Sequence, residues 1–176
     1  MLCCIQMRLN NLRTKFFLFA MIMSGFFWLG GTVYRSIIAY RLFEPFSLVV
    51  RSELTYESIA QTLLIIGGVT VYILAAYILF IVFYILFVFN SKINFKQNGW
   101  FFMSTIIFAI FLPVEIFLMN IDLQFALLVH SQGFDLNRGM SLLIQRIGAL
   151  SGLPAISFFA YFTTIWLAIF QPLRRI

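Results

Sequence analysis

The chain has 176 residues, of which 62% are hydrophobic and only 10% are charged, and its formal net charge is +6. About half of an ordinary soluble domain is apolar, so this composition, with a mean hydropathy of +1.00, excludes a water-soluble globule and predicts an integral membrane protein. A membrane-spanning helix needs about 20 predominantly apolar residues, and the chain offers four such segments.

The first predicted span covers residues 16–35 and is bracketed by two basic residues, Lys15 and Arg35. The second covers residues 59–89 and is longer than one crossing requires, so we expect it to tilt, to project beyond the bilayer or to bend at its Gly-Gly pair. Its ILFIVFYILFVF run is apolar on every side, whereas the strands of a membrane β-barrel alternate between apolar and polar residues. We therefore expect a helix.

The third predicted span covers residues 100–121 and the fourth covers residues 148–171. A helix satisfies all its backbone hydrogen bonds within one segment, as the core of a bilayer requires. The predicted fold class is therefore all-α: an integral membrane four-helix bundle that forms a single polytopic membrane domain over residues 1–176.

The two longest connections cover residues 36–58 and 122–141, and each is too short for a hydrophobic core of its own. The segments LQFALLVHSQGF and MSLLIQRIGAL carry spaced apolar residues interrupted by polar ones. Such spacing predicts short amphipathic helices in the outer loops, lying on the membrane surface.

Basic residues predict the orientation, because cytoplasmic segments retain an excess of Lys and Arg. The N-terminal tail, the connection between the second and third spans and the C-terminal tail carry basic residues and no acid, whereas the other two connections mix both signs. Both termini are therefore expected in the cytoplasm, and the predicted location is the bacterial inner membrane. The positive charge follows from this topology and from contact with the lipid bilayer, so no nucleic-acid partner is predicted.

Residues that could carry catalysis or hold a cofactor are scarce. His130 is the one histidine, which cannot supply both axial ligands of a membrane haem, and no Cys or acid stands at ligand spacing from it. The chain also lacks the glycine-rich phosphate loops and the hydrolase and metalloprotease motifs. We predict neither an enzyme nor a bound cofactor or metal.

One acid, Glu115, falls inside the third span, within the run FLPVEIFLMN. An ionised carboxylate costs at least a few kcal/mol at that depth, so we expect it to be neutral, paired or wetted by a cavity. Arg146 and Arg35 are its candidate partners, because both are expected near the same level of the bilayer. Glu115 then forms a structural bridge with Arg146, belongs to a proton or ion path, or meets a charge on a partner protein.

Small residues at the start of the fourth span form a candidate helix-packing face: Gly148, Ser151, Gly152 and Ala155. Gly148 and Gly152 make a G-x-x-x-G motif, which lets another helix approach closely. The face is expected to pack against another helix of the same chain or against a partner subunit. Pro154 lies within it, so the same strip could mark a bend between an outer helix and the fourth span.

Two classes of function fit these features. The first is a small multi-pass membrane protein that binds another integral membrane protein, as an accessory subunit, an assembly factor or an immunity-type inhibitor of a pore. The general plan resembles that of the four-span immunity proteins that protect bacteria from pore-forming bacteriocins, in size, charge balance and cytoplasmic termini. The second is a small transporter or channel that uses Glu115 and forms its pathway as a homo-oligomer. A cavity beside Glu115 would favour the second class, and a single arginine the first.

Overall fold

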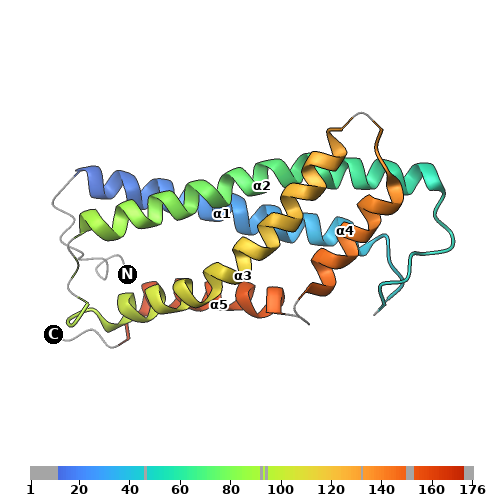
Figure 1. The fold of residues 1–176 in the computed structure, drawn as a ribbon. Coiled ribbons are helices and arrows are strands. Elements are labelled where there is room, and N and C mark those ends of the chain that lie inside the picture. The colour runs from blue at the N-terminus through green and yellow to red at the C-terminus, as the bar shows by residue number, and fades with distance from the viewer. Residues whose placement is uncertain are drawn as a thin grey trace.

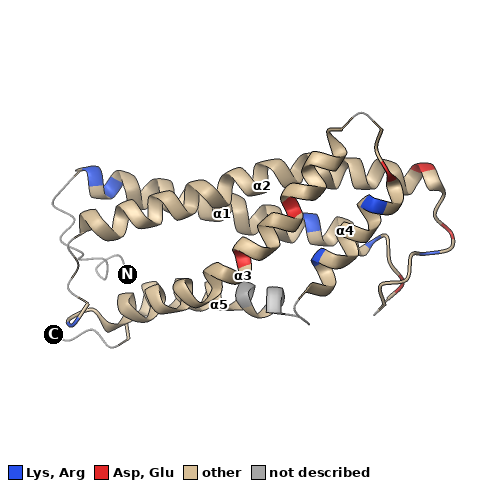
Figure 2. Ribbon diagram, in the orientation of Figure 1, with Lys and Arg blue, Asp and Glu red and all other residues tan. Residues whose placement is uncertain are grey.

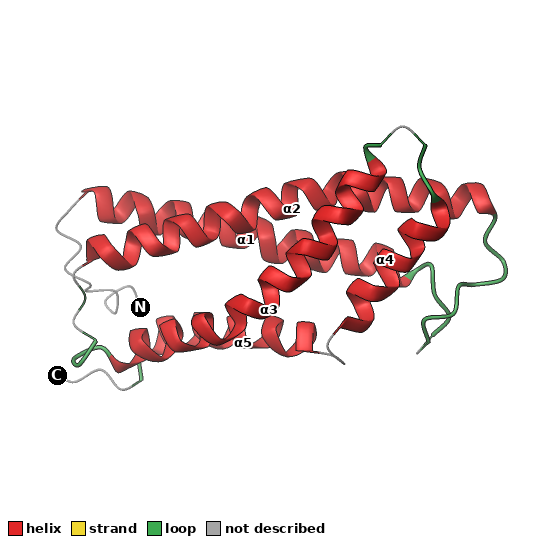
Figure 3. Ribbon diagram, in the orientation of Figure 1, coloured by secondary structure: helices red, strands yellow, loops and turns green. Residues whose placement is uncertain are grey.

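The computed structural model of the chain is all-α (Figure 3). It describes residues 12–45, 47–91, 93, 95–131, 133–149 and 153–172, and for residues 153–155, 157 and 158 it describes the backbone only. The residues so described form five helices: α1 (Leu12–Tyr40), α2 (Tyr56–Ser91), α3 (Gly99–Val129), α4 (Leu136–Gly148) and α5 (Leu153–Phe170) (Figure 1).

Three of the helices are long and apolar enough to cross a membrane, since α1, α2 and α3 have 29, 36 and 31 residues. At about 1.5 Å per residue, each exceeds the roughly 30 Å of bilayer hydrocarbon. The membrane character expected from composition is therefore confirmed for these three helices. α5 is shorter, with 18 residues, and its stretch Phe159–Phe170 is apolar.

Two of the long helices continue beyond the predicted spans. α1 extends to Tyr40 and α3 extends to Val129. The separate outer helix predicted in LQFALLVH is therefore wrong, because these residues are the last turns of α3 and bury Phe125 in the core. Between α1 and α2 the chain makes turns and one antiparallel bridge, Phe43 to Val50, and the residues described there form no helix.

The amphipathic helix predicted in MSLLIQRIGAL is confirmed as α4. Asp135 caps its N-terminus, where the carboxylate accepts hydrogen bonds from the backbone N–H groups of Asn137 and Arg138 at 2.9 and 3.3 Å. Leu142 and Leu143 are buried, whereas the Arg138 side chain is exposed. One face of α4 therefore packs on the rest of the chain and the other faces outward.

The fourth predicted span, residues 148–171, corresponds mainly to α5, and only its first residue, Gly148, belongs to α4. α4 ends at Gly148, because the next residue, Ala149, takes φ −57° and ψ 134°, outside the helical region. α5 then begins at Leu153, with Pro154 in its first turn, where a missing backbone N–H leaves no hydrogen bond unmade.

The long helices are arranged as two pairs (Figure 1). α1 packs along α2, and α5 packs along α3, while α3 crosses α2 and α4 covers α3 near that crossing. The start of α1, the connection from α2 to α3 and the end of α5 lie at one end of the molecule. The α1–α2 and α3–α4 connections lie at the opposite end.

Glycines mark two places where helices come close. In α1, a Cβ added to Gly31 would stand 2.8 Å from the Ile73 side chain of α2. Where α2 crosses α3, a Cβ added to Gly67 would overlap the Val129 side chain. The α1–α2 contact and the α2–α3 crossing therefore each depend on a residue without a side chain.

Buried side chains form three clusters along the length of the molecule. The first lies where α1, α2, α3 and α4 meet, and includes Leu63 and Phe125. The second is aromatic: the Tyr77 and Tyr161 rings lie 4.6 and 4.9 Å from the Trp28 ring, which joins α2 and α5 to α1. The third lies where the end of α2 meets the start of α3.

Candidate functional site

Charged side chains of α1, α3 and α4 contact one another, and Asp122 of α3 is common to these contacts. Figure 2 marks the positions of charged residues along these helices. Nη1 of Arg35 lies 2.9 Å from Asp122 Oδ2. Nε of Arg146 donates hydrogen bonds to Asp122 Oδ1 at 3.1 Å and to Oδ2 at 3.2 Å. One carboxylate therefore pairs with two arginines from different helices.

α2 joins the same group through a hydroxyl. Nη1 of Arg35 donates to Thr70 Oγ1 at 3.4 Å, and the Thr70 hydroxyl donates to the backbone oxygen of Ile66 at 2.7 Å. Both Thr70 and Ile66 are completely or almost completely buried. Polar contacts at this level therefore connect α1, α2, α3 and α4.

All three charged side chains are shielded from solvent, with exposed fractions of 7% for Arg35, 8% for Asp122 and 15% for Arg146. Taking an ion out of water costs several kcal/mol, which opposite charges offset only at close range and with good hydrogen bonds. Arg146 reaches this place because it follows Leu142 and Leu143 by about one helical turn and so shares their inward face.

The two arginines predicted to pair with Glu115 both contact Asp122. Sequence reasoning missed Asp122 because the third span is predicted to end one residue before it, which assigns this acid to an outer loop. Helical spacing was the available signal. Asp122 follows Glu115 by about two turns, so both acids fall on one face of a continuous helix.

Glu115 is buried, with 7% of its surface exposed, and lies on the wall of a cleft of about 520 Å³. Residues of α1, α3, α4 and α5 line this cleft: Trp28, Thr32, Val33, Arg35, Ser36, Ile37, Ala39, Tyr40, Glu115, Leu143, Arg146, Ile147 and Phe159. The predicted acid therefore borders a cavity, and both predicted arginines border the same cavity.

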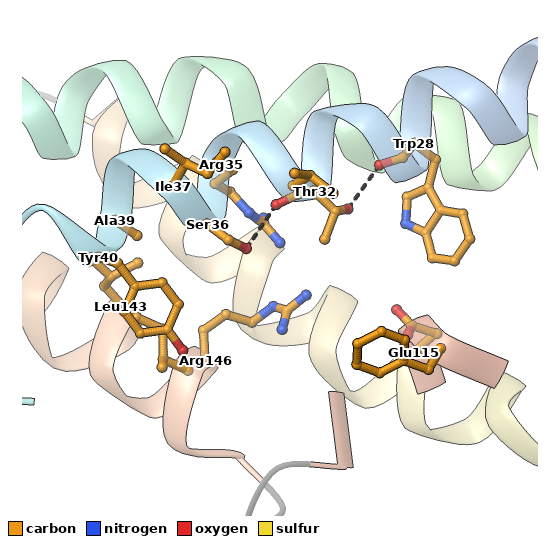
Figure 4. Close-up of a pocket in the computed structure, with 13 residues that line it drawn as sticks. Trp28, Thr32, Arg35, Ser36, Ile37, Ala39, Tyr40, Glu115, Leu143 and Arg146 are labelled. Atoms are coloured by element: carbon orange, nitrogen blue, oxygen red, sulfur yellow. Dashed lines mark hydrogen bonds between the residues drawn. The ribbon is translucent and has the colours of Figure 1, made fainter. Parts of the chain in front are cut away.

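Figure 4 shows how the polar groups are distributed in the cleft. The guanidinium groups of Arg35 and Arg146 point into it from opposite sides, whereas Glu115 lies farther along, near Trp28. The Thr32 hydroxyl donates to the backbone oxygen of Trp28, and the Ser36 hydroxyl to that of Thr32, each at 2.8 Å. These hydroxyl hydrogens are used within α1, so the guanidinium groups are the strong donors in this part of the cleft.

The predicted helix-packing face is not brought together as one helical surface. Gly148 is the last residue of α4, and a Cβ added there would make ordinary contact with Leu48 at 3.7 Å. Ser151 and Gly152 lie outside the described residues, as does the side chain of Ala155, whose backbone belongs to α5. The members whose positions are described therefore stand on two different helices.

Metal-binding groups are also scarce at this site. In the part of the chain that the structure describes, no three His, Cys, Asp or Glu residues stand close enough to hold a metal ion together.

Comparison with known proteins finds no matching family model, no similar curated protein and no similar solved structure.

Proposed function

We propose that the chain is a four-span membrane protein, with α5 as the fourth span and both termini on the cytoplasmic side of a bacterial inner membrane. The proposal is supported by the gathering of the start of α1, the α2–α3 connection and the end of α5 at one end of the molecule (Figure 1). Figure 2 shows basic residues at the start of α1 and in the α2–α3 connection, the segments that contain Arg13, Lys15 and Lys96. Such an excess of basic residues is typical of the cytoplasmic side.

We propose further that the protein acts by binding another integral membrane protein, through the outward face of α1. Among the described helices, α1 packs mainly on α2. Large aromatic side chains recur on the face of α1 that points away from α2, and those of Phe19, Phe26 and Phe27 are between 62% and 70% exposed. Lipid would also cover such a face, so the deciding observation is a glycine.

Gly30 lies on the same outward face of α1, and a Cβ added to it would meet none of the described residues within 4 Å. Gly31 differs, because an added Cβ would press on Ile73 of α2. Packing against α2 therefore explains why position 31 is a glycine, but it does not explain why position 30 is one. A bare backbone on an aromatic, membrane-facing surface is what another helix needs for close approach, so Gly30 is the single observation that carries the interaction proposal.

A pull-down of the tagged protein from its native membrane in mild detergent, with mass spectrometry, tests this proposal. We expect a stoichiometric membrane protein to come with the wild type and to be lost with Gly30→Leu. Gly68→Leu is the matched control, because Gly68 lies in α2 and a Cβ there also meets nothing within 4 Å. Recovery of the chain without a partner would overturn the proposal, and equal losses for both variants would remove α1 as the interface.

A second candidate function is a small transporter or channel, and the position of Glu115 favours it. Glu115 is buried in the wall of a cavity, which is an arrangement expected of an acid that takes up protons. Proton flux into liposomes containing the purified protein distinguishes this candidate. A flux that disappears in Glu115→Gln would support transport by a homo-oligomer, and absence of flux in the wild type would exclude a proton path.

A further inference from the structure

The cleft between α1, α4 and α5 opens sideways. The side chains of Val33, Ile37 and Tyr40 on α1 and of Phe159 on α5 line it and are between 41% and 68% exposed. These side chains belong to the lateral surfaces of the helices, which face lipid when the helices cross a bilayer. A molecule can therefore enter the cleft from the bilayer, along the membrane plane.

The size of the cleft matches a small ligand. Its volume of about 520 Å³ falls within the range of roughly 300–1,000 Å³ that is typical of ligand pockets. A transmembrane helix would need more room, because its backbone and side chains together are about 10 Å across. The occupant is therefore a molecule that combines apolar chains with a compact polar group.

The polar part of the cleft is positively charged. Asp122 neutralises one of the two arginines and does not line the cleft itself, so it stands behind them. Arg35 contacts Asp122 through Nη1 and Arg146 through Nε, which leaves other N–H groups of the two guanidiniums for a ligand. Glu115 lies at the far part of the cleft beside Trp28 (Figure 4), so an anion is favoured at the arginines and not along the whole cavity.

We propose that this cleft binds an anionic phospholipid, with its phosphate between the guanidinium groups of Arg35 and Arg146. Its acyl chains then lie against the exposed apolar side chains of α1 and α5. The charges match at the arginine end of the cleft, where two arginines and one aspartate leave a single positive charge for a singly charged phosphodiester, and Glu115 lies farther along the cleft. This site goes beyond the proposed function, because it requires no protein partner.

Native mass spectrometry of the detergent-solubilised protein tests the site, with phosphatidylglycerol and phosphatidylcholine as probes. We expect one phosphatidylglycerol per chain, bound about tenfold or more tightly than phosphatidylcholine, because both lipids carry the phosphodiester but the choline cation of phosphatidylcholine cancels its charge and is repelled by the arginines. Arg146→Gln should weaken phosphatidylglycerol binding by a similar factor. Arg138→Gln, which removes an exposed arginine from the same helix, should leave it unchanged.

A second variant keeps the test independent of the arginine pair. Ser36 lines the cleft and is half-buried, so Ser36→Phe fills the cavity without removing a charge. We expect it to abolish lipid binding while gel filtration and circular dichroism remain those of the wild type, and Met23→Phe, outside the cleft on α1, to have no effect. Equal binding of the two lipids, equal effects of Arg138→Gln and Arg146→Gln, or full competition by inorganic phosphate would each overturn the proposal.

Discussion

At the scale of single residues, Asp122 is the group on which the interior charges depend. It is the carboxylate that contacts both Arg35 and Arg146, at 2.9 and 3.1 Å, and it is itself almost completely buried. Removing one arginine leaves a pair, whereas removing the aspartate leaves two like charges facing each other in an apolar surrounding. Substitution of Asp122 is therefore expected to destabilise the protein more than substitution of either arginine.

We predict that Asp122→Asn lowers the free energy of unfolding by roughly 3–5 kcal/mol, the cost of leaving buried charges without their counter-ion. Unfolding in mixed micelles, followed by circular dichroism during titration with dodecyl sulfate, measures this loss. Glu57→Gln is the control, because Glu57 is an exposed acid in the first turn of α2 and should change stability by less than about 0.5 kcal/mol. Similar losses for the two variants would contradict the central role of Asp122.

The same geometry predicts which acid Arg146 is coupled to. In double-mutant cycles, Arg146→Gln and Asp122→Asn should be non-additive by about 1 kcal/mol or more, because their side chains share two hydrogen bonds. As a control, Arg146→Gln combined with Glu57→Gln, which changes an exposed acid in the first turn of α2, should come within about 0.5 kcal/mol of additivity. Equal coupling energies in the two cycles would contradict a specific contact between Arg146 and Asp122.

At the scale of helices, the crossing of α2 and α3 depends on Gly67. A side chain at this position would overlap Val129, near the last turn of α3. The neighbouring Gly68 makes a matched control, since a Cβ there meets nothing within 4 Å. Of the two glycines in the second predicted span, Gly67 is therefore needed for the contact between α2 and α3, whereas Gly68 is not.

We predict that Gly67→Ala destabilises the protein by about 1–3 kcal/mol, the usual effect of overpacking, and that Gly68→Ala is neutral or slightly stabilising. Val129→Ala should restore much of the loss in the Gly67→Ala background, because it removes the methyl groups that the new Cβ meets. Thermal unfolding in one detergent compares the four proteins. A loss that Val129→Ala does not relieve would mean that the crossing is not limited by this contact.

Helix existence could be predicted from the sequence, and helix length could not. Apolar runs long enough for a bilayer predict the centres of α1, α2 and α3, because the requirement of about 20 apolar residues depends on the bilayer alone. The end of α3 was missed because a charged residue next to an apolar span is normally assigned to a loop, and the sequence does not show the counter-ions of Asp122. Those counter-ions, Arg35 and Arg146, come from helices distant in sequence, so only the folded chain shows that the acid belongs inside.

The candidate site was predictable in part for the same reason. Composition makes any charge inside an apolar span expensive, which is enough to single out Glu115, Arg35 and Arg146. Which acid pairs with which base depends on helix rotation and on where α4 lies, and the spacing of residues along one helix does not determine either. The break at Ala149 lies where Pro154 suggested a bend between an outer helix and the fourth span, although helical periodicity alone does not give its position because the apolar pattern continues past it.

At the scale of the whole molecule, the two ends differ in the connections that they carry (Figure 1). We predict that single cysteines introduced at Lys96 and Ser47, in a variant lacking Cys3 and Cys4, report opposite sides of the membrane. A membrane-impermeant maleimide applied to intact cells should label the cysteine at Ser47 and reach the one at Lys96 only after the membrane is opened. Labelling in the opposite order would invert the proposed orientation, and labelling of both in intact cells would contradict the span between them.

The shared contact of Arg35 and Arg146 with Asp122 also has a consequence for biosynthesis. A ribosome delivers α1 and α2 first, so Arg35 enters the translocation machinery before its counter-ion has been made. Until α3 arrives, the α1–α2 hairpin holds an uncompensated guanidinium near one end of a helix, where a long side chain can still reach water. Asp122 neutralises this charge only when α3 is in place, so we expect the α1–α2 hairpin to be less stable in lipid alone than together with α3.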